Sequence, residues 1–284
     1  MKKERKSQFQ VYKLVYYFFL GLATIIILIP IIWMLSASFD RVNSYQLPFP
    51  PRFIPGNPSI FNYEMVITNM KILNYIANTV IVVLLSSMLL LLIVPISGFA
   101  FSKGRFPFKS ILLLGIMSSM MVPFESKIMP IFNLCRSLGL TNTYLGIVLP
   151  GVMTSSFFIF LCKKAFDDLP DDLMESATID GASKIRCFVQ IYLPLIGSIL
   201  ATMAVLNLMN VWNDLLWPMI IVNQNARSTI QVGLAMFSSG TDAISKHAGM
   251  SAAASMLSIL PLTVTFVFLQ RYIVQSIAVS GIKQ

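Results

Sequence analysis

The amino-acid sequence predicts an all-α integral membrane protein with six transmembrane helices and a structured cytoplasmic loop between the fourth and fifth spans. Hydrophobic residues make up 56% of the 284 residues, charged residues make up only 12%, and the mean hydropathy is +0.76. Such a composition is typical of membrane proteins. The apolar runs are long and continuous rather than short and alternating, which favours helices over a β-barrel.

Six stretches approach the roughly 20 apolar residues that a helix needs to cross the hydrocarbon core of a bilayer. They run from Leu14 to Ser38, Ile76 to Ser97, Ile111 to Leu134, Tyr144 to Leu161, Leu195 to Val222 and Ala252 to Tyr272. Polar residues interrupt the third run, at Glu125 and Lys127, and the fifth, at Asn207, Asn210 and Asp214. We therefore expect one six-span domain, residues 14–272, between cytoplasmic segments 1–13 and 273–284.

Prolines mark the connections and the spans. The segment from Phe39 to Tyr75 contains Pro48, Pro50, Pro51, Pro55 and Pro58, so we expect no regular helix there. Six further prolines fall in or near spans: Pro30, Pro95, Pro123, Pro130, Pro218 and Pro261. An ordinary kink is the simplest explanation of any single one. Six together favour a bundle around a pathway, where protein or water can satisfy the freed carbonyls.

The distribution of Lys and Arg predicts the orientation in the membrane, because these residues accumulate in cytoplasmic loops. Fourteen lie on the side of the N-terminus: Lys2, Lys3, Arg5, Lys6, Lys13, Lys103, Arg105, Lys109, Lys163, Lys164, Lys184, Arg186, Arg271 and Lys283. Seven lie on the other side: Arg41, Arg52, Lys71, Lys127, Arg136, Arg227 and Lys246. Both termini and the loop around Glu175 are thus predicted to be cytoplasmic. The net charge of +9 then serves orientation and contact with anionic lipid, not nucleic-acid binding.

The loop between the fourth and fifth spans, residues 163–194, has the signals of a helix pair. Asp172 and Glu175 have the spacing of a capping box at a helix start. Gly181 follows where a helix would stop with a left-handed residue, and Ser183 can cap a second helix. That second helix carries an apolar stripe of Ile185, Phe188, Val189, Tyr192 and Leu193, followed by Pro194. Two interpretations remain open from these residues: a helix pair on the bilayer surface, or a docking site for a soluble partner.

At these residues the chain resembles the permease subunits of bacterial ATP-driven importers, in the carbohydrate-uptake group that includes the smaller maltose-transporter permease. The family loop reads E-A-A, then D-G-A three residues on, then F, I and L-P. The counterparts here are Glu175, Ser176, Ala177, Asp180, Gly181, Ala182, Phe188, Ile191, Leu193 and Pro194. Further matches include Phe61-Asn62-Tyr63, Asn78-Thr79, Ser97-Gly98-Phe99-Ala100-Phe101-Ser102, Met121-Val122-Pro123, Trp212-Asn213-Asp214-Leu215-Leu216-Trp217-Pro218, Gln270-Arg271-Tyr272 and Ser280-Gly281-Ile282-Lys283.

The resemblance implies that the loop is a coupling helix seated in a groove of a cytoplasmic ATPase. Glu175 would pair with a basic residue of that ATPase and Ala177 would permit close approach. Asp180 and Gly181 would fix the turn between the two helices, and Ala182 belongs to the same ATPase-coupling set. Ser176 replaces the usual alanine but is also small. By the same resemblance, the tail at Gly281 and Lys283 would contact the ATPase, although the last residue is Gln284 rather than glycine.

The resemblance also implies the partners and the location. These are a homologous second permease forming a heterodimer, a pair of ATP-binding-cassette ATPases, an extracytoplasmic solute-binding protein, and lipid of the bacterial plasma membrane. No G-x-x-x-x-G-K-[ST] motif occurs, so ATP and Mg²⁺ are expected on the separate ATPase, with no cofactor on this chain. We expect a transport subunit and no enzyme. Neither the lone His247 nor the three cysteines Cys135, Cys162 and Cys187 suggest a catalytic or metal site.

The polar residues of the fifth span are the candidates for substrate contact, because polar groups at membrane depth are usually functional. The candidates are Asn207, Asn210, Trp212, Asn213 and Trp217, although the two tryptophans also suit an interfacial aromatic belt. The expected cargo is a sugar or oligosaccharide, with glycerol 3-phosphate or another polar solute as the alternative. Asp214 and Glu125 leave proton-coupled secondary transport as a rival. A membrane scaffold without transport activity is a third possibility.

Overall fold

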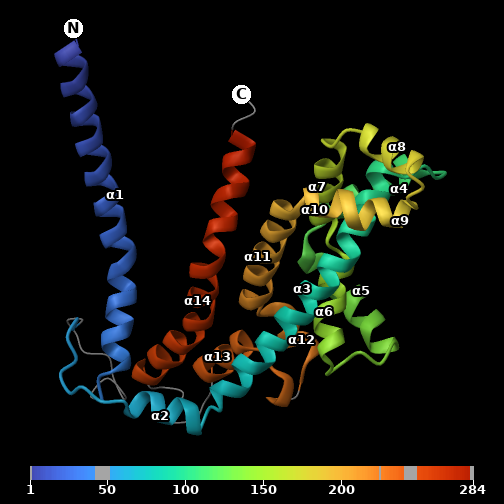
Figure 1. Ribbon diagram of the computed structural model, residues 1–284. Coiled ribbons are helices and arrows are strands. Elements are labelled where there is room, and N and C mark those ends of the chain that lie inside the picture. Colours follow the sequence, from blue (N-terminus) through green and yellow to red (C-terminus); the bar gives the residue numbers. More distant parts are fainter. Residues whose placement is uncertain (1, 42–51, 224, 240–247, 282–284) are drawn as a thin grey trace. The chain divides into compact units, whose positions relative to one another are not determined.

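The structure is a computed structural model that describes residues 2–41, 52–223, 225–239 and 248–281 (Figure 1). The regular structure of these ranges is helical, and their extended pairing is limited to an isolated bridge between Asp40 and Pro58. The α-helices are α1 Lys2–Ser38, α2 Phe61–Thr68, α3 Ile72–Lys103, α4 Lys109–Ser118, α5 Phe124–Ser137, α6 Tyr144–Met153, α7 Ser156–Asp167, α8 Asp172–Ile179, α9 Lys184–Cys187, α10 Leu193–Leu195, α11 Gly197–Asn213, α12 Leu216–Ile221, α13 Ile230–Ser239 and α14 Ala248–Gly281. Short 3-10 turns cover Ser119–Met121 and Asn225–Arg227, and a π-helical turn covers Phe188–Tyr192.

Six apolar segments of the described residues are long enough to cross a membrane. Three are single helices, Lys13–Ser38, Ile72–Lys103 and Ala248–Phe268. Three are bent pairs: α4 and the following 3-10 turn with α5 at 111°, α6 with α7 at 49°, and the segment Lys184–Leu195 with α11 at 75°. The prediction of an all-α membrane protein is confirmed, with six spans when each bent pair is counted as one.

Local backbone chemistry explains two of the bends. Val122 and Pro123 are extended (φ −88°, ψ 119° and φ −54°, ψ 144°), and a residue before proline is disfavoured in helical conformation. In the fifth span, Pro194 follows a π-helical turn, a rare distortion that accompanies sharp helix kinks, and Ile196 then leaves helical geometry. By contrast, Pro30, Pro95, Pro130 and Pro261 lie inside helices. The continuous third span expected from Ile111 to Leu134 is therefore broken near its middle.

Two further expectations need correction. The expected fifth span ran on to Val222, but α11 ends at Asn213, because Asp214 is extended (φ −72°, ψ 119°) before the separate helix α12. The segment from Phe39 to Tyr75 was expected to contain no regular helix, yet α2 begins at Phe61. All of the segment's prolines precede it, so the backbone N–H groups of α2 are complete.

The chain divides into two compact units. The first comprises residues 1–72 and 234–260, and the second comprises residues 73–233 and 261–284. In the first unit, the buried carboxylate of Asp40 accepts hydrogen bonds from the backbone N–H groups of Gly56 (2.9 Å) and Asn57 (3.2 Å). The buried amide of Asn62 donates to the carbonyls of Ser38 and Asp40 at 3.0 and 3.1 Å. These bonds hold the segment after α1 against the start of α2.

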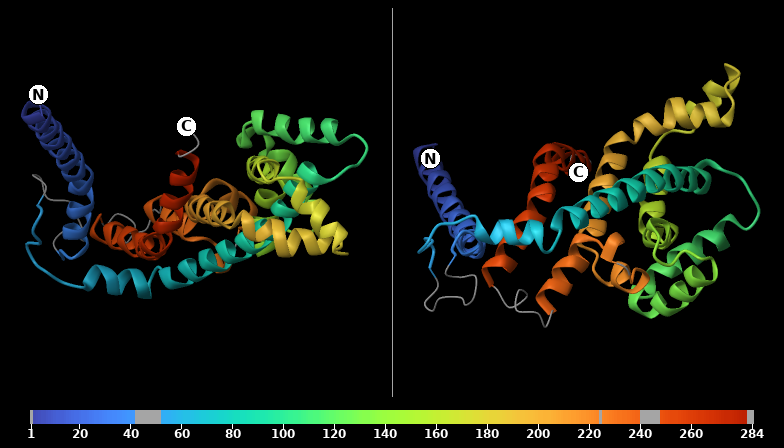
Figure 2. Two further views of the ribbon diagram at one scale, coloured as in Figure 1. Left: turned by 45° about the horizontal axis from the view of Figure 1, so that its top comes forward. Right: turned by 90° about the horizontal axis from the view of Figure 1, so that it is seen from below.

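The second unit contains a hydrophobic core cluster and both candidate sites. Figures 1 and 2 show α3 as one long helix, with α8 and α9 beside its C-terminal end. Core residues come from α3, α6, α7, α11 and α12, and they include Val82, Leu90, Val94, Val152, Cys162, Phe166, Met203, Trp217 and Ile221. Gly98 of α3 is buried against α7, where an added Cβ would lie 2.5 Å from the Cβ of Cys162. This glycine therefore sets the close approach of the two helices.

Candidate functional site

The first candidate site is a polar helical hairpin made of α8, the turn 180–183 and α9. Gly181 ends α8 with φ +80°, as its left-handed position predicts. Its N–H donates to the carbonyl of Thr178 at 3.0 Å, and the N–H of Ala182 donates to that of Ala177 at 2.9 Å. This pair of bonds is a Schellman motif. The Ser183 hydroxyl accepts from the N–H of Arg186 at 3.3 Å, which confirms the predicted cap of α9.

The predicted capping box at the start of α8 is wrong. The N-cap is Asp171, which makes no side-chain cap hydrogen bond, and the N–H of Glu175 donates instead to the Asp171 carbonyl at 3.2 Å. The Asp171 carboxylate is used elsewhere, because it accepts from the Lys103 Nζ at 2.5 Å. A contact with another helix thus replaces the local cap, and it leaves the Glu175 carboxylate exposed.

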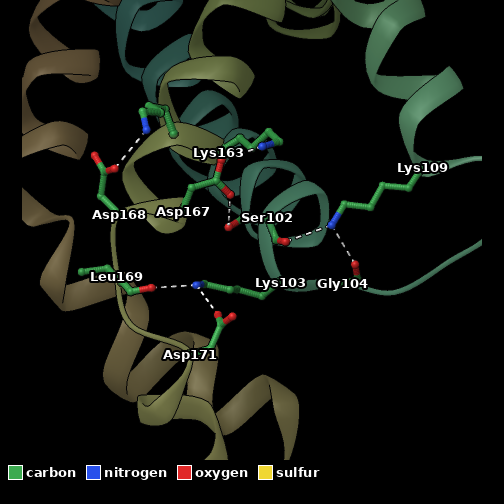
Figure 3. A network of polar contacts seen from close by, with 10 residues as sticks. Ser102, Lys103, Gly104, Lys109, Lys163, Asp167, Asp168, Leu169 and Asp171 are labelled. Carbon is green, nitrogen blue, oxygen red and sulfur yellow. Dashed lines mark hydrogen bonds and ion pairs between the residues drawn. The ribbon is translucent and has the colours of Figure 1, made fainter.

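A network of charged contacts ties the hairpin to the C-terminal end of α3 (Figure 3). Besides Asp171, the Lys103 Nζ reaches the carbonyl of Leu169 at 2.7 Å and lies 5.8 Å from the centre of the Tyr192 ring. The Lys103 side chain is only 8% exposed, whereas that of Asp171 is 78% exposed. Next to it, Asp167 accepts from the Ser102 hydroxyl at 2.7 Å and from Lys163 at 2.6 Å. Lys103 therefore joins α3 to the segment that leads into α8.

Aromatic side chains also contribute to this junction between α3, α7 and the hairpin. The ring of Phe99 on α3 lies 5.4 Å from Phe166 of α7, 5.0 Å from Phe188 and 5.3 Å from Tyr192, measured between centres. Tyr192 is fully buried, and its hydroxyl donates to the carbonyl of Pro170 at 3.2 Å. Since Phe188 and Tyr192 follow α9 directly, the hairpin is held to α3 and α7 on both sides.

The solvent-exposed surface of the hairpin combines apolar and polar groups. Ile179 is 86% exposed and Ile185 is 77% exposed. Among the residues proposed from the sequence, the structure places Glu175, Ser176, Asp180 and Gly181 at the surface, Ala182 partly buried and Ala177 buried. The Ser176 hydroxyl donates to the carbonyl of Asp172 at 2.9 Å. Beside this surface lies a cleft of about 790 Å³, whose lining includes Lys103, Arg105, Lys109, Asp171, Glu175, Ile179 and Lys184.

The second candidate site is a cavity of about 630 Å³ within the same unit. Four of the five candidates from the fifth span line it, namely Asn207, Asn210, Asn213 and Trp217. The fifth, Trp212, is buried but is not part of the described lining. Sequence reasoning missed Thr154 and Ser155, which also line the cavity. Their signal was a polar pair within the fourth apolar run, which the sequence analysis did not weigh.

Two of the cavity residues also have structural roles. Trp217 is 2% exposed, and its ring N–H donates to the carbonyl of Gly146 at 3.0 Å. The amide of Asn207 donates to the hydroxyls of Ser86 and Ser87 at 3.2 and 3.1 Å. Through these bonds, α12 is tied to α6 and α11 is tied to α3.

Three sequence predictions lie outside these sites. Gly281 is the last residue of α14, whereas Lys283 and His247 lie outside the described residues. The cysteines Cys135, Cys162 and Cys187 are buried and unpaired with one another. Within the part of the chain that the structure describes, no group of three or more His, Cys, Asp or Glu side chains could hold a metal ion.

Comparison with known proteins places this chain in a known class of membrane protein. Residues 93–279 match the family model described as binding-protein-dependent transport system inner membrane component. The arabinooligosaccharides transport system permease protein AraQ of Halalkalibacterium halodurans is 30% identical over 232 residues, which are 81% of this chain and 82% of the relative. The sn-glycerol-3-phosphate transport system permease protein UgpE of Brucella abortus is 29% identical over 279 residues, or 95% of this chain and 98% of the relative.

A solved structure confirms the fold. It belongs to a bacterial ABC transporter involved in the import of the acidic polysaccharide alginate, and it matches with a TM-score of 0.77 at 22% identity. The match covers 93% of this chain and 96% of the other. Because the family model matches residues 93–279, more than half of this chain, and a 30% identical relative is matched over most of both chains, this chain belongs to the family of binding-protein-dependent transport system inner membrane components, the permease subunits of ABC importers.

Proposed function

We propose that this permease pairs with a homologous, non-identical permease to form the pathway for a sugar or oligosaccharide delivered by an extracytoplasmic binding protein. The observation that carries the proposal is the α8–α9 hairpin, which exposes Glu175 and two isoleucines and is tied to α3 by Lys103. The arabinooligosaccharide relative supports the substrate class. The glycerol-3-phosphate relative supports the alternative, a small phosphorylated solute.

The hairpin is proposed to dock on a separate ATPase that binds ATP and Mg²⁺, while this chain binds no cofactor. The sequence contains no phosphate-binding G-x-x-x-x-G-K-[ST] motif. Exposed apolar side chains next to a carboxylate suit a protein interface, in which buried apolar contacts supply affinity and charges set register. Ile179 and Ile185 would supply the apolar contacts. Glu175 would pair with a basic residue of the ATPase, and Gly281 and Lys283 form a second proposed contact.

The contacts of the hairpin suggest how ATPase motion would enter the membrane. When the two ATPases close on ATP, they would draw the hairpins of the two permeases together. The Lys103 network and the aromatic junction at Phe99 would transmit this movement to α3 and α7. The cavity would then open to the binding protein on the outer side. This alternating access requires both termini and the hairpin to be cytoplasmic, as the charge distribution predicts.

Reversal of the Glu175 charge tests the docking. Loss of one partner from a hydrogen-bonded charge pair in an interface costs about 2–5 kcal/mol, so Glu175→Arg should lower uptake at least about thirtyfold. Binding-protein-dependent stimulation of the ATPase should be lost as well. Both would be measured on the assembled transporter in proteoliposomes. Glu64→Arg is the matched control, because Glu64 is an exposed acid on α2, and its uptake should stay within about twofold of the parent.

Unchanged uptake and unchanged ATPase stimulation in the Glu175→Arg variant would contradict the docking proposal. The rival mechanism, proton-coupled transport, is tested in the same proteoliposomes by adding a protonophore while ATP is maintained. Uptake should continue, because ATP supplies the energy for an ABC importer. Loss of uptake with ATP still present would favour the proton-coupled mechanism.

A further inference from the structure

The described lining of the cavity beside α11 carries negative charge and no positive charge. Among the lining residues that the structure describes, the charged side chain is the carboxylate of Asp214, with no lysine, arginine or histidine beside it. The remaining polar members are amides and hydroxyls, contributed by Ser86, Thr154, Ser155, Asn207, Asn210 and Asn213. Aromatic and aliphatic side chains complete the wall, including Phe124, Phe158 and Trp217. A ligand in this cavity therefore meets a negative charge with no cation from the described lining to offset it.

The position of the Asp214 carboxylate is set by the break between α11 and α12. One carboxylate oxygen accepts from the N–H of Trp217 at 3.4 Å. Trp217 is itself fixed, because its ring N–H donates to the carbonyl of Gly146. Asp214 is partly exposed and lines the cavity. The acid is thus held at the wall by the backbone of the following helix and is not paired with a base in the described residues.

The hydrogen-bonding groups of the wall are mostly acceptors. The hydroxyls of Thr154 and Ser155 donate to the carbonyls of Pro150 and Gly151 in their own helical turn, each at 2.7 Å, so they offer lone pairs to the cavity. The Asn213 amide donates to the Met209 carbonyl at 2.8 Å. Its oxygen and the Asp214 carboxylate are further acceptors, while its second N–H remains a donor.

Donors are fewer on the same wall. Asn210 lies one helical turn before Asp214, and its side chain makes no hydrogen bond within the described part of the chain. Its amide is therefore available to a ligand as a donor and as an acceptor. A ligand that fits this wall must offer many hydrogen-bond donors and must require few hydrogen-bond donors from the protein. Sugar hydroxyls meet this condition because each can donate, whereas a phosphate or carboxylate only accepts.

We propose that this cavity is the substrate-binding part of the pathway contributed by this chain, and that it accepts neutral polyhydroxylated ligands and rejects anionic ones. The proposal rests on the proposed import function and narrows its substrate class to neutral sugars, against phosphorylated or acidic solutes. An anion would lie near Asp214 where water is partly excluded, and like charges repel more strongly there than in bulk water. It would also face acceptors with which it cannot hydrogen-bond.

The charge of the cavity can be measured without any transport assay. In the assembled transporter carrying Asn210→Cys, the new thiol would be labelled with a cationic and with an anionic methanethiosulfonate, and both rates would be normalised to those of free 2-mercaptoethanol. A unit charge about 6 Å away changes each rate about threefold even in bulk water, so the normalised cation-to-anion ratio should reach about tenfold. The unmodified transporter is the control for this chain's native thiols, since Cys135, Cys162 and Cys187 are buried.

Asp214→Asn in the same background isolates the carboxylate. The asparagine oxygen can still accept from the N–H of Trp217, so the start of α12 is preserved. The cation-to-anion ratio should then fall close to one. An equal ratio before and after this substitution would overturn the charge assignment, even if sugar uptake were normal. Conversely, the transporter could show a high cation-to-anion labelling ratio and yet import no sugar. The charge assignment would then stand, and the proposed function would be contradicted.

Protection of the cavity from labelling by a bound ligand tests whether the cavity accepts neutral sugars and rejects anions. Arabinotriose and glycerol 3-phosphate, at equal concentrations, would be compared for their ability to slow labelling of Cys at position 210 by a neutral maleimide. Arabinotriose should slow the labelling at least about threefold, and glycerol 3-phosphate should do so only after Asp214→Asn removes the charge. Equal protection by both solutes with Asp214 intact, or protection by neither, would overturn the proposal.

Discussion

Replacement of Lys103 with methionine is expected to uncouple ATP hydrolysis from transport while leaving the helices folded. The Lys103 ammonium bonds to the Asp171 carboxylate and to the Leu169 carbonyl, and its side chain is 8% exposed. A hydrogen bond to a charged group contributes about 1.5–3 kcal/mol, so the hairpin loses much of its attachment to α3. Asp171 is 78% exposed and is solvated when its partner is lost, which limits the damage to the junction.

The measurement is the ratio of sugar uptake to ATP hydrolysed in proteoliposomes. We expect this ratio to fall at least about tenfold, since a loss of 1.4 kcal/mol already changes an equilibrium tenfold. Lys164→Met is the matched control, because it removes the same charge from an exposed i,i+4 pair with Asp168, and such pairs contribute little. Lys103→Arg should restore part of the coupling because it keeps the charge. If Lys103→Met and Lys164→Met behave alike, Lys103 does not position the hairpin.

Replacement of Gly98 with alanine adds one methyl group between α3 and α7, and we expect it to destabilise the transporter. The added Cβ would lie 2.5 Å from the Cβ of Cys162 and 3.0 Å from the backbone nitrogen of Lys163. Neither atom can rotate away, so α3 and α7 must separate. Overpacking of this kind costs about 1–3 kcal/mol or more, and the aromatic junction between the same two helices would shift with it.

The thermal midpoint of the purified complex, followed by fluorescence, would measure this effect. Gly115→Ala is the control, because Gly115 lies exposed in α4 with no heavy atom within 4 Å of an added Cβ. That change should be neutral or stabilising, by up to about 1 kcal/mol. Cys162→Gly should partly rescue Gly98→Ala, since it removes the nearest clashing atom. A midpoint that is unchanged by Gly98→Ala would show that α3 and α7 do not pack as closely as described.

The hairpin shows which local features could be predicted. The left-handed Gly181 and the Ser183 cap were correct, because both depend on backbone geometry within a few residues. The capping box between Asp172 and Glu175 was wrong, because the neighbouring Asp171 is the N-cap and pairs with Lys103, about 70 residues earlier in the chain. A long-range contact of this kind leaves no periodic signal in the sequence.

The fifth span shows the same division. Its amides and tryptophans were recognised as unusual for a membrane helix, and most of them do line the cavity. Their separate roles were not predictable, because Trp217 donates to Gly146 and Asn207 donates to serines of α3. Asn210, three residues after Asn207, has no such side-chain partner among the residues that the structure describes. Composition alone does not distinguish these two amides.

The sequence by itself determined the class of the protein, the six apolar segments and the position of the polar hairpin, because hydropathy and turn chemistry act over short stretches of chain. The tertiary structure alone decided how Lys103 anchors the hairpin and which polar residues share a cavity with Asp214. These features depend on residues far apart in the chain, such as Gly98 with Cys162 and Trp217 with Gly146. Packing brings those residues together only after the helices have formed and associated.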